Sequence, residues 1–287
     1  MGIPRRLTRR QGRAALVDGI SFELPVVCAP SPVLMAAFTI DARKAAALLP
    51  GTEIFPLRLW SGRGVLMMVV IDYQQTTIGK YIEFSVGIAC THGQRQAPPL
   101  LPAALMGLFG TGQYVFDLPV SSEISVKGGK GIWGMPKHQA NLDFRITDTT
   151  VSSKYELDGL HALTIEIDRP SSAWMPVRMA AANYCAFRGM LMKSYIYFTG
   201  KAGLSLFRKG SARLTIGEHP RVQALRSLDI SPDPLMTAFI PNARGTLDDH
   251  FEAWFLDYPR VPDRVPEGLE SVASLGLSED WLAPPRR

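Results

Sequence analysis

Cysteine is scarce in this sequence, with three residues in 287, at positions 28, 90 and 185. So small and odd a number, without any Cys-x-x-Cys spacing, excludes a disulfide framework and is typical of a reducing compartment. We therefore expect a cytoplasmic protein. The five histidines are also scattered, with no His-x-His or His-Glu-x-x-His motif, so we expect no metal site.

Long hydrophobic runs are absent as well. The longest, residues 64–71 and 100–110, fall short of the ~18 apolar residues that a membrane-spanning helix needs, so we expect no membrane partner. Arg5 and Arg6 form a pair typical of twin-arginine export signals, but Asp18 and Glu23 interrupt the apolar segment that such a signal requires. The sequence therefore predicts no export signal.

The first thirteen residues contain no acidic side chain but five arginines, at positions 5, 6, 9, 10 and 13. The whole chain has 31 basic and 26 acidic residues, so without these five arginines the two charges balance at 26 each. The positive charge is thus confined to an N-terminal arm, residues 1–17, and does not indicate a nucleic-acid-binding surface. We expect the arm to be solvated or to contact another subunit of a homo-oligomer.

No linker-like stretch, shift of composition or repeat of fixed period divides the chain. With 46% hydrophobic residues, a chain of 287 residues can bury a large core. We predict a single domain over residues 1–287, with the basic arm at one end and a peripheral tail from about residue 268 to residue 287 at the other.

The apolar pattern predicts many strands and few helices. The 22 prolines and 25 glycines are spread along the chain, as expected for many turns. Strands are predicted at residues 55–60, 64–73, 81–90, 123–126, 134–146, 152–157, 163–167, 192–198 and 213–216, and short helices at 41–49, 103–109 and 220–228. We expect a mainly β (β-rich α+β) fold, in which a curved antiparallel sheet closes into a cone-like barrel with an internal pocket and few peripheral helices.

Residues 131–138, Gly-Ile-Trp-Gly-Met-Pro-Lys-His, place a single lysine after an apolar run. Free lysine has a pKa near 10.4 and is protonated at neutral pH, so it attacks a carbonyl only where its surroundings disfavour the charge. If residues 132–139 form a strand, Trp133, Met135 and Lys137 share one face and His138 points to the other. Such an apolar face would desolvate the amine. The alternative is a surface lysine whose methylenes lie on the Trp133 ring.

Residues 129–134 also match the pattern Gly-x-Gly-x-x-Gly, and Glu156 follows at a suitable distance for a dinucleotide site. Pro136 and the β-prone residues after it block the helix whose N-terminus would hold a pyrophosphate. We therefore expect no dinucleotide and no other cofactor.

Residues 129–138, Gly-Lys-Gly-Ile-Trp-Gly-Met-Pro-Lys-His, resemble the active-site signature of the acetoacetate decarboxylase family, a Gly-Arg-Glu-Leu-Trp-Gly-Phe/Tyr-Pro-Lys-Lys type run. The family's Schiff-base lysine follows the proline directly, and this role maps onto Lys137. Residues 79–83, Gly-Lys-Tyr-Ile-Glu, resemble the family's Gly-x-Tyr-x-Glu strand, whose carboxylate faces the pocket; this maps onto Glu83. The likeness runs from about residue 33 to residue 256.

The resemblance implies a lysine activated by an apolar pocket or a neighbouring cation. Its catalytic residues would be Lys137 and Glu83, and its substrate-binding residues Trp133, Met135, Met68 and Tyr81. Without the resemblance, a glutamate at the end of a strand would be expected to face water.

The sequence departs from the family's pattern at three places. His138 stands where the family has a second lysine, no arginine occurs between Arg13 and Arg43, and Met68 aligns with the family's second glutamate. Asp72 would replace that glutamate only if the register shifts. An arginine is the natural holder of the carboxylate of a β-keto acid, so its loss weighs against acetoacetate as the substrate. Imine chemistry needs only an unprotonated amine, a carbonyl substrate and a proton shuttle.

Three classes of function remain open. The first is a Schiff-base lyase that acts on a keto acid through Lys137, by decarboxylation of a β-keto acid or by aldol condensation and dehydration. The second is a non-catalytic barrel of the same superfamily that binds a small molecule. The third is a structural or regulatory subunit, for which only the basic arm argues. We predict the lyase.

Overall fold

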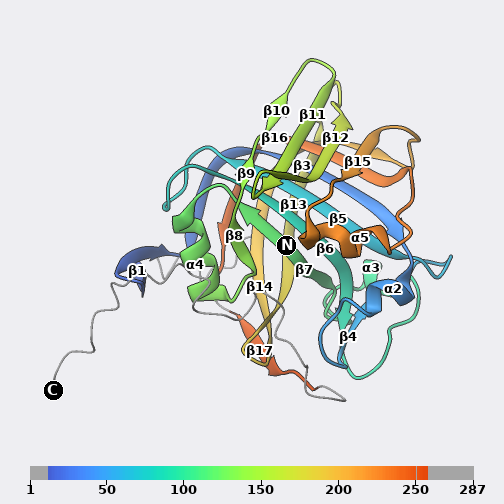
Figure 1. The fold of residues 1–287 in the computed structure, drawn as a ribbon, viewed down its shortest axis with the longest axis horizontal. Coiled ribbons are helices and arrows are strands. Elements are labelled where there is room, and N and C mark those ends of the chain that lie inside the picture. The colour runs from blue at the N-terminus through green and yellow to red at the C-terminus, as the bar shows by residue number, and fades with distance from the viewer. Residues whose placement is uncertain (1–11, 250, 258–287) are drawn as a thin grey trace.

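The computed structural model describes residues 12–249 and 251–257, and the described chain is built around a closed barrel (Figure 1). Seven strands form the barrel in the order β6-β5-β3-β16-β14-β13-β7, and β7 pairs back onto β6. Their bounds are β3 (Val26–Ile40), β5 (Gly64–Tyr73), β6 (Tyr81–His92), β7 (Gly112–Val120), β13 (Met175–Phe187), β14 (Met190–Leu206) and β16 (Pro234–Leu247). The predicted mainly β barrel is confirmed, with one refinement: β7 and β13 are parallel, and the other neighbours in the ring are antiparallel.

Three short strands extend this sheet. They are β4 (Ile54–Pro56) beside β6, β8 (Lys137–Gln139) beside β7, and β17 (Glu252–Phe255) beside β14. Strand β8 is parallel to β7, and its register places Lys137 opposite Leu118. The candidate nucleophile therefore lies on a strand that is hydrogen-bonded to the barrel wall.

A second sheet covers one outer side of the barrel (Figure 1). Its strands are β9 (Asn141–Leu142), β10 (Arg145–Ile146), β11 (Thr150–Leu157), β12 (Leu160–Asp168) and β15 (Ala212–Ile216). The largest hydrophobic core lies between the two sheets, where Leu34, Met68 and Phe84 of the barrel join Tyr155 and Ile165 of the second sheet. Strands β3 and β5 thus bury both faces, which explains why they read as continuous apolar runs.

Short helices fill the connections between strands. They are α2 (Ala42–Ala46), α3 (Leu101–Ala104), α4 (Glu123–Trp133), α5 (Gln223–Arg226) and the 3-10 turn η1 (Pro220–Val222). The strand predicted at 123–126 is wrong because α4 occupies it, and the long strand predicted at 134–146 is wrong because this segment forms only the short strands β8, β9 and β10. Trp133 is therefore helical, Met135 lies in the connection after α4, and of the three only Lys137 lies in a strand.

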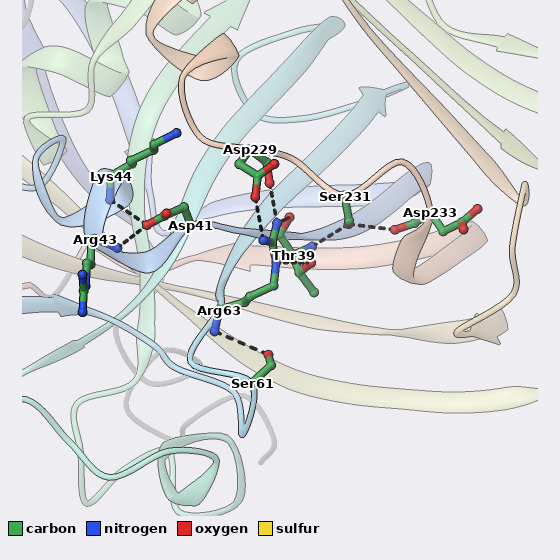
Figure 2. A network of polar contacts seen from close by, with 9 residues as sticks. All are labelled: Thr39, Asp41, Arg43, Lys44, Ser61, Arg63, Asp229, Ser231 and Asp233. Atoms are coloured by element: carbon green, nitrogen blue, oxygen red, sulfur yellow. Dashed lines mark hydrogen bonds and ion pairs between the residues drawn. The ribbon is translucent and has the colours of Figure 1, made fainter.

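Arg63 braces one end of the barrel (Figure 2). Its guanidinium donates from Nε to Thr39 Oγ1 at 2.8 Å and pairs with Asp229 at 2.7 Å. Beside it, Asp41 caps α2 by accepting hydrogen bonds from the backbone N–H groups of Arg43 and Lys44. These contacts connect β3, β5 and the segment after α5, so they hold the wall of the barrel and not its interior.

An N-terminal hairpin of β1 (Arg13–Val17) and β2 (Ile20–Leu24) packs against α4. Within the predicted basic arm, Arg13 forms an ion pair with Asp249. Residues 1–11 of that arm and the predicted tail at 268–287 lie outside the described residues. None of the helices in the described ranges has the length and apolarity to cross a bilayer.

Candidate active site

The interior of the barrel holds a cavity of about 480 Å³, which we call the barrel cavity. Alternate residues of β5 and β6 face it, from Tyr73 and Tyr81 at one end to Val65 and Ala89 at the other. Most of the lining is aliphatic or thioether in character, and Glu83 is its one carboxylate among the described residues. The other members include the aromatic Tyr73, Tyr81 and Phe198 and the polar Ser85, Thr111, Gln113 and Asn183. No arginine of the described chain lines it.

Lys137 does not itself line the barrel cavity but contacts Glu83, which does. Its Nζ lies 2.7 Å from Oε2 of Glu83 and donates to the Oγ of Ser125 at 2.9 Å. The lysine is only 3% exposed, although it carries a charge when protonated. The carboxylate of Glu83, whose side chain is 15% exposed, is thus the direct charge partner of this buried amine.

Aromatic and thioether groups surround the amine. The Tyr81 ring lies 5.3 Å from Lys137 Nζ, and its phenol is within hydrogen-bonding reach of Ser125 and Tyr73. Met135 lines the barrel cavity on the same side. Burial, followed by the charge of Glu83, raises the pKa of Tyr81 well above its ordinary value, so the phenol stays neutral.

Two buried thiols, Cys28 and Cys185, have pKa values that the charge of Lys137 lowers slightly against the effect of burial. Burial raises the pKa of Cys28 to about 12, and the Glu83 carboxylate adds to this. Burial likewise raises the pKa of Cys185 to about 12. Because the thiolate is the nucleophilic form, neither thiol competes with the amine near neutral pH.

Helix α4 packs against the side chain of Lys137. It begins at the N-cap Ser122, whose side chain accepts from Ser125 N, and it ends at Gly134 in the left-handed conformation (φ 64°). A Cβ at Gly129 would lie 2.3 Å from the Cδ of Lys137. The glycine therefore provides the space in which the lysine side chain runs towards Glu83.

His138 points away from Lys137, as expected for adjacent residues of a strand. Its Nε2 lies 3.0 Å from the Tyr155 hydroxyl and its Nδ1 lies 3.5 Å from Asp117 Oδ1, between the two sheets. Tyr155 donates to Asp117 Oδ2 at 3.2 Å, and Arg221 lies 3.6 Å from Asp117 Oδ1. Burial raises the pKa of Asp117 to about 7 against the opposing pull of Arg221, and burial with the charge of Arg221 lowers the pKa of His138 to about 3.

Two of the predicted substrate-binding residues lie away from the barrel cavity. Met68 is fully buried in the core between the two sheets, because the odd-numbered neighbours Met67 and Val69 face the cavity instead. Trp133 is buried at the end of α4, where its Nε1 donates to the backbone carbonyl of Asp248 at 2.8 Å. In this structure neither side chain lines the cavity, and both lie at structural positions. Asp72 is also on the outer face of β5, so it does not replace the missing glutamate.

The sequence reasoning missed Ser125, Gly129 and the residues around His138. Ser125 and Gly129 both lie in α4, where the sequence pattern predicts a strand at residues 123–126 and no helix. The Ser122-Glu123 start of the helix was the available signal, since serine is a favoured N-cap residue and an acidic side chain suits the first turn. In the described part of the chain, no group of three or more His, Cys, Asp and Glu residues is arranged to hold a metal ion.

Comparison with known families gives a match for most of this sequence. The sequence profile described as "Acetoacetate decarboxylase (ADC)" matches residues 7–185, which is more than half of the chain. The protein belongs to the acetoacetate decarboxylase family. A search of curated proteins finds no match.

Solved structures of the acetoacetate decarboxylase family share the fold. An acetoacetate decarboxylase from Legionella pneumophila subsp. pneumophila str. Philadelphia 1 has a TM-score of 0.54 at 15% identity, covering 78% of this chain and 85% of that one. The enduracididine biosynthesis enzyme MppR, complexed with the condensation product of pyruvate and imidazole 4-carboxaldehyde, has a TM-score of 0.55 at 12% identity, covering 80% and 88%. An acetoacetate decarboxylase-like enzyme from Sphingomonas wittichii RW1 has a TM-score of 0.50 at 12% identity, covering 80% and 94%. At these identities the likeness shows a common fold and does not assign an activity.

Proposed function

We propose that the protein is a lyase that forms a Schiff base between Lys137 and a keto acid. The observation that carries the proposal is the pair of Lys137 Nζ and Glu83 Oε2, 2.7 Å apart, in which the lysine is buried and the glutamate lines an apolar cavity. An amine becomes nucleophilic only after it loses its proton, and a carboxylate in direct contact is placed to take it. Membership of the family supports the same chemistry.

The sequence of bond changes follows from this geometry. Glu83 accepts a proton from the Lys137 ammonium, and the free amine then attacks the ketone carbon. The resulting carbinolamine loses water to give an iminium ion, and Glu83 returns a proton to the departing hydroxyl. The Ser125 hydroxyl, 2.9 Å from Nζ, holds the amine in position through these steps.

The iminium ion supports two outcomes. With a β-keto acid, the bond to the carboxylate breaks, its electron pair moves to the iminium nitrogen, and CO₂ and an enamine result. With pyruvate, loss of a proton from the methyl carbon gives the enamine directly, which then attacks an aldehyde before water is lost. Because no arginine among the described residues lines the cavity, a substrate carboxylate is balanced here only by the iminium charge.

Borohydride trapping tests this proposal. Incubation with acetoacetate or with pyruvate, followed by reduction and peptide mass spectrometry, should give a stable adduct on Lys137. Lys137→Ala should give none, and Lys80→Ala, which alters an exposed lysine, should give the wild-type yield. Release of CO₂ from acetoacetate, or formation of an unsaturated product from pyruvate and an aldehyde, then distinguishes the two outcomes. Absence of any adduct on Lys137 with every keto acid would overturn the proposal.

A further inference from the structure

The barrel cavity is much larger than the keto acids that are the simplest candidates. An engineered apolar cavity of roughly 150 Å³ holds one benzene molecule. The barrel cavity has about 480 Å³, and pyruvate has no more non-hydrogen atoms than benzene. A small keto acid bound at Lys137 would therefore leave most of the volume unfilled.

The unfilled part extends in one direction from the reacting amine. Glu83 lies opposite Ile71 in the register of β5 and β6, and Met67 lies opposite Gly87. Four residues of a strand span roughly 13 Å, so the cavity continues at least that far beyond Glu83. Ala37, which lies opposite Met67 on β3, lines this far part.

The walls of the far part are apolar and carry no charge. Met35, Ala37, Val65 and Met67 line it. The two amide side chains of the lining are bonded to each other, Gln113 Nε2 donating to Asn183 Oδ1 at 2.8 Å, and the Thr111 hydroxyl donates to the Pro102 carbonyl at 2.8 Å. A charged tail would lose its hydration there without gaining an ionic partner.

The opening of the cavity is also apolar. Ala103 and Met106 both line the cavity and are exposed, so the cavity reaches solvent at the segment that contains α3. Leu101, Leu105 and Leu108 of this segment are also exposed. Apolar side chains gathered at the mouth of an apolar cavity are typical of a binding site for an apolar ligand.

From these observations we infer that the substrate carries a long uncharged apolar tail, an alkyl or aryl-alkyl chain attached to the carbonyl carbon that Lys137 attacks. The carbonyl lies at Glu83 and the tail runs along β5 and β6 past Ala37. This inference names the substrate class of the proposed imine chemistry and rests on that function. Tail binding itself is a property of the cavity and does not require the amine.

The test uses a series of straight-chain keto acids: pyruvate, 2-oxohexanoate, 2-oxononanoate and 2-oxododecanoate. The concentration that gives half-maximal borohydride trapping should fall by about threefold to fourfold per added methylene, until the chain fills the cavity. Half-maximal concentrations that stay constant or rise with chain length would overturn the inference while leaving imine formation at Lys137 intact.

Substitutions along the predicted path sharpen the test. Ala37→Phe should lower trapping of 2-oxododecanoate relative to pyruvate by at least tenfold, and Ala37→Leu, a smaller change, serves if the phenylalanine variant does not fold. Ala104→Phe adds the same bulk at an exposed residue of α3 that does not line the cavity, and it should leave the ratio unchanged. An unchanged ratio in both Ala37 variants would also refute the path.

Binding of 2-dodecanone to the Lys137→Ala protein, measured by calorimetry, separates the two proposals. Binding that strengthens with chain length from 2-hexanone to 2-dodecanone, combined with no adduct in the wild type, would show an apolar binding cavity without imine chemistry. Adducts in the wild type, combined with no chain-length effect on either protein, would leave the lyase and remove the apolar tail.

Discussion

The side chain of Lys137 fills the space beside Gly129 and leaves no room for a methyl group at residue 129. A Cβ at residue 129 would lie 2.3 Å from Cδ of Lys137 and 2.8 Å from its Cε. Since Lys137 is fixed at its far end by Glu83 and Ser125, the side chain can yield only by giving up those contacts. Helix α4 thus fixes the position of the Lys137 amine.

The first prediction is that Gly129→Ala lowers the rate of imine formation. A displacement of the amine by about 1 Å costs on the order of 10- to 100-fold in rate, because the reacting atoms lose their alignment. The rate of borohydride trapping with pyruvate measures this.

Gly131→Ala is the matched control for Gly129→Ala. It adds the same atom to the same helix, but that Cβ would meet Val17 of the N-terminal hairpin at 2.5 Å and not the lysine. It should lower the melting temperature by a similar amount and leave the trapping rate within about threefold. Equal loss of trapping in both variants would mean that helix stability, and not the space at Gly129, limits the lysine.

The second prediction separates the two roles of Glu83. In Glu83→Gln no carboxylate is left to take the proton of the Lys137 ammonium or to protonate the departing hydroxyl, so adducts with pyruvate should form more slowly. Turnover should fall by roughly 10²-fold or more, because no group is left to move protons in the later steps. Trapping and steady-state rates are measured on one preparation. Turnover within a few-fold of the wild type would remove Glu83 from proton transfer.

The sequence pattern predicted the strands of the barrel better than the helix that positions the lysine. Strand β5 was predicted at residues 64–73, as observed, because an apolar run that begins at a glycine and contains several β-branched residues is typical of a buried strand. Helix α4 contains Gly128, Gly129 and Gly131, each of which costs about 1 kcal/mol relative to alanine in a helix. Contacts with Phe22, Lys137 and Val17 require these glycines. Phe22 and Val17 are distant in sequence, so no local pattern reveals these two contacts.

The sequence pattern predicted only part of the candidate site. Lys137 and Glu83 were paired through the family signature, since nothing local connects residues 54 positions apart. Met68, predicted to bind substrate, lies in the core, because adjacent residues of a strand face opposite sides and a shift of one residue exchanges the cavity for the core. Only the pairing of β5 with β6, which sets Ile71 against Glu83, decides which residues face inward.

The third prediction concerns Trp133 as a structural residue. Trp133→Phe removes the Nε1–H donor and leaves the buried carbonyl of Asp248 without this partner, which costs about 1 to 3 kcal/mol of unfolding free energy. The trapping rate should stay within about threefold of the wild type. Trp174→Phe, at a residue that is 68% exposed, should change neither quantity. A loss of trapping without a loss of stability would return Trp133 to the substrate site.

The buried pair of Asp117 and His138 supports a prediction about pH. Burial raises the pKa of Asp117 from 3.8 to about 7 and lowers the pKa of His138 from 6.5 to about 3. Between pH about 4 and 6.5 the folded pair therefore holds one proton, on Asp117. The unfolded pair also holds one proton, on His138. Because the proton counts are equal, the pair adds no pH dependence to the unfolding free energy of the wild type in this range.

Each single substitution should leave only one of the two residues with a difference in bound protons between the folded and unfolded states, so the unfolding free energy should become dependent on pH. In Asp117→Asn the unfolded chain binds one proton more than the folded protein, so the unfolding free energy should fall by about 1.4 kcal/mol per pH unit as the pH drops below 6.5. In His138→Gln the folded protein binds one proton more, so the unfolding free energy should rise by a similar amount per unit as the pH drops from 7 towards 4. Urea unfolding at several pH values, each compared with the wild type, measures both slopes. Asp148→Asn, at an exposed aspartate of the same chain, is the control and should follow the wild type. If the unfolding free energies of all four proteins change with pH in parallel, neither Asp117 nor His138 gains or loses a proton on unfolding as expected.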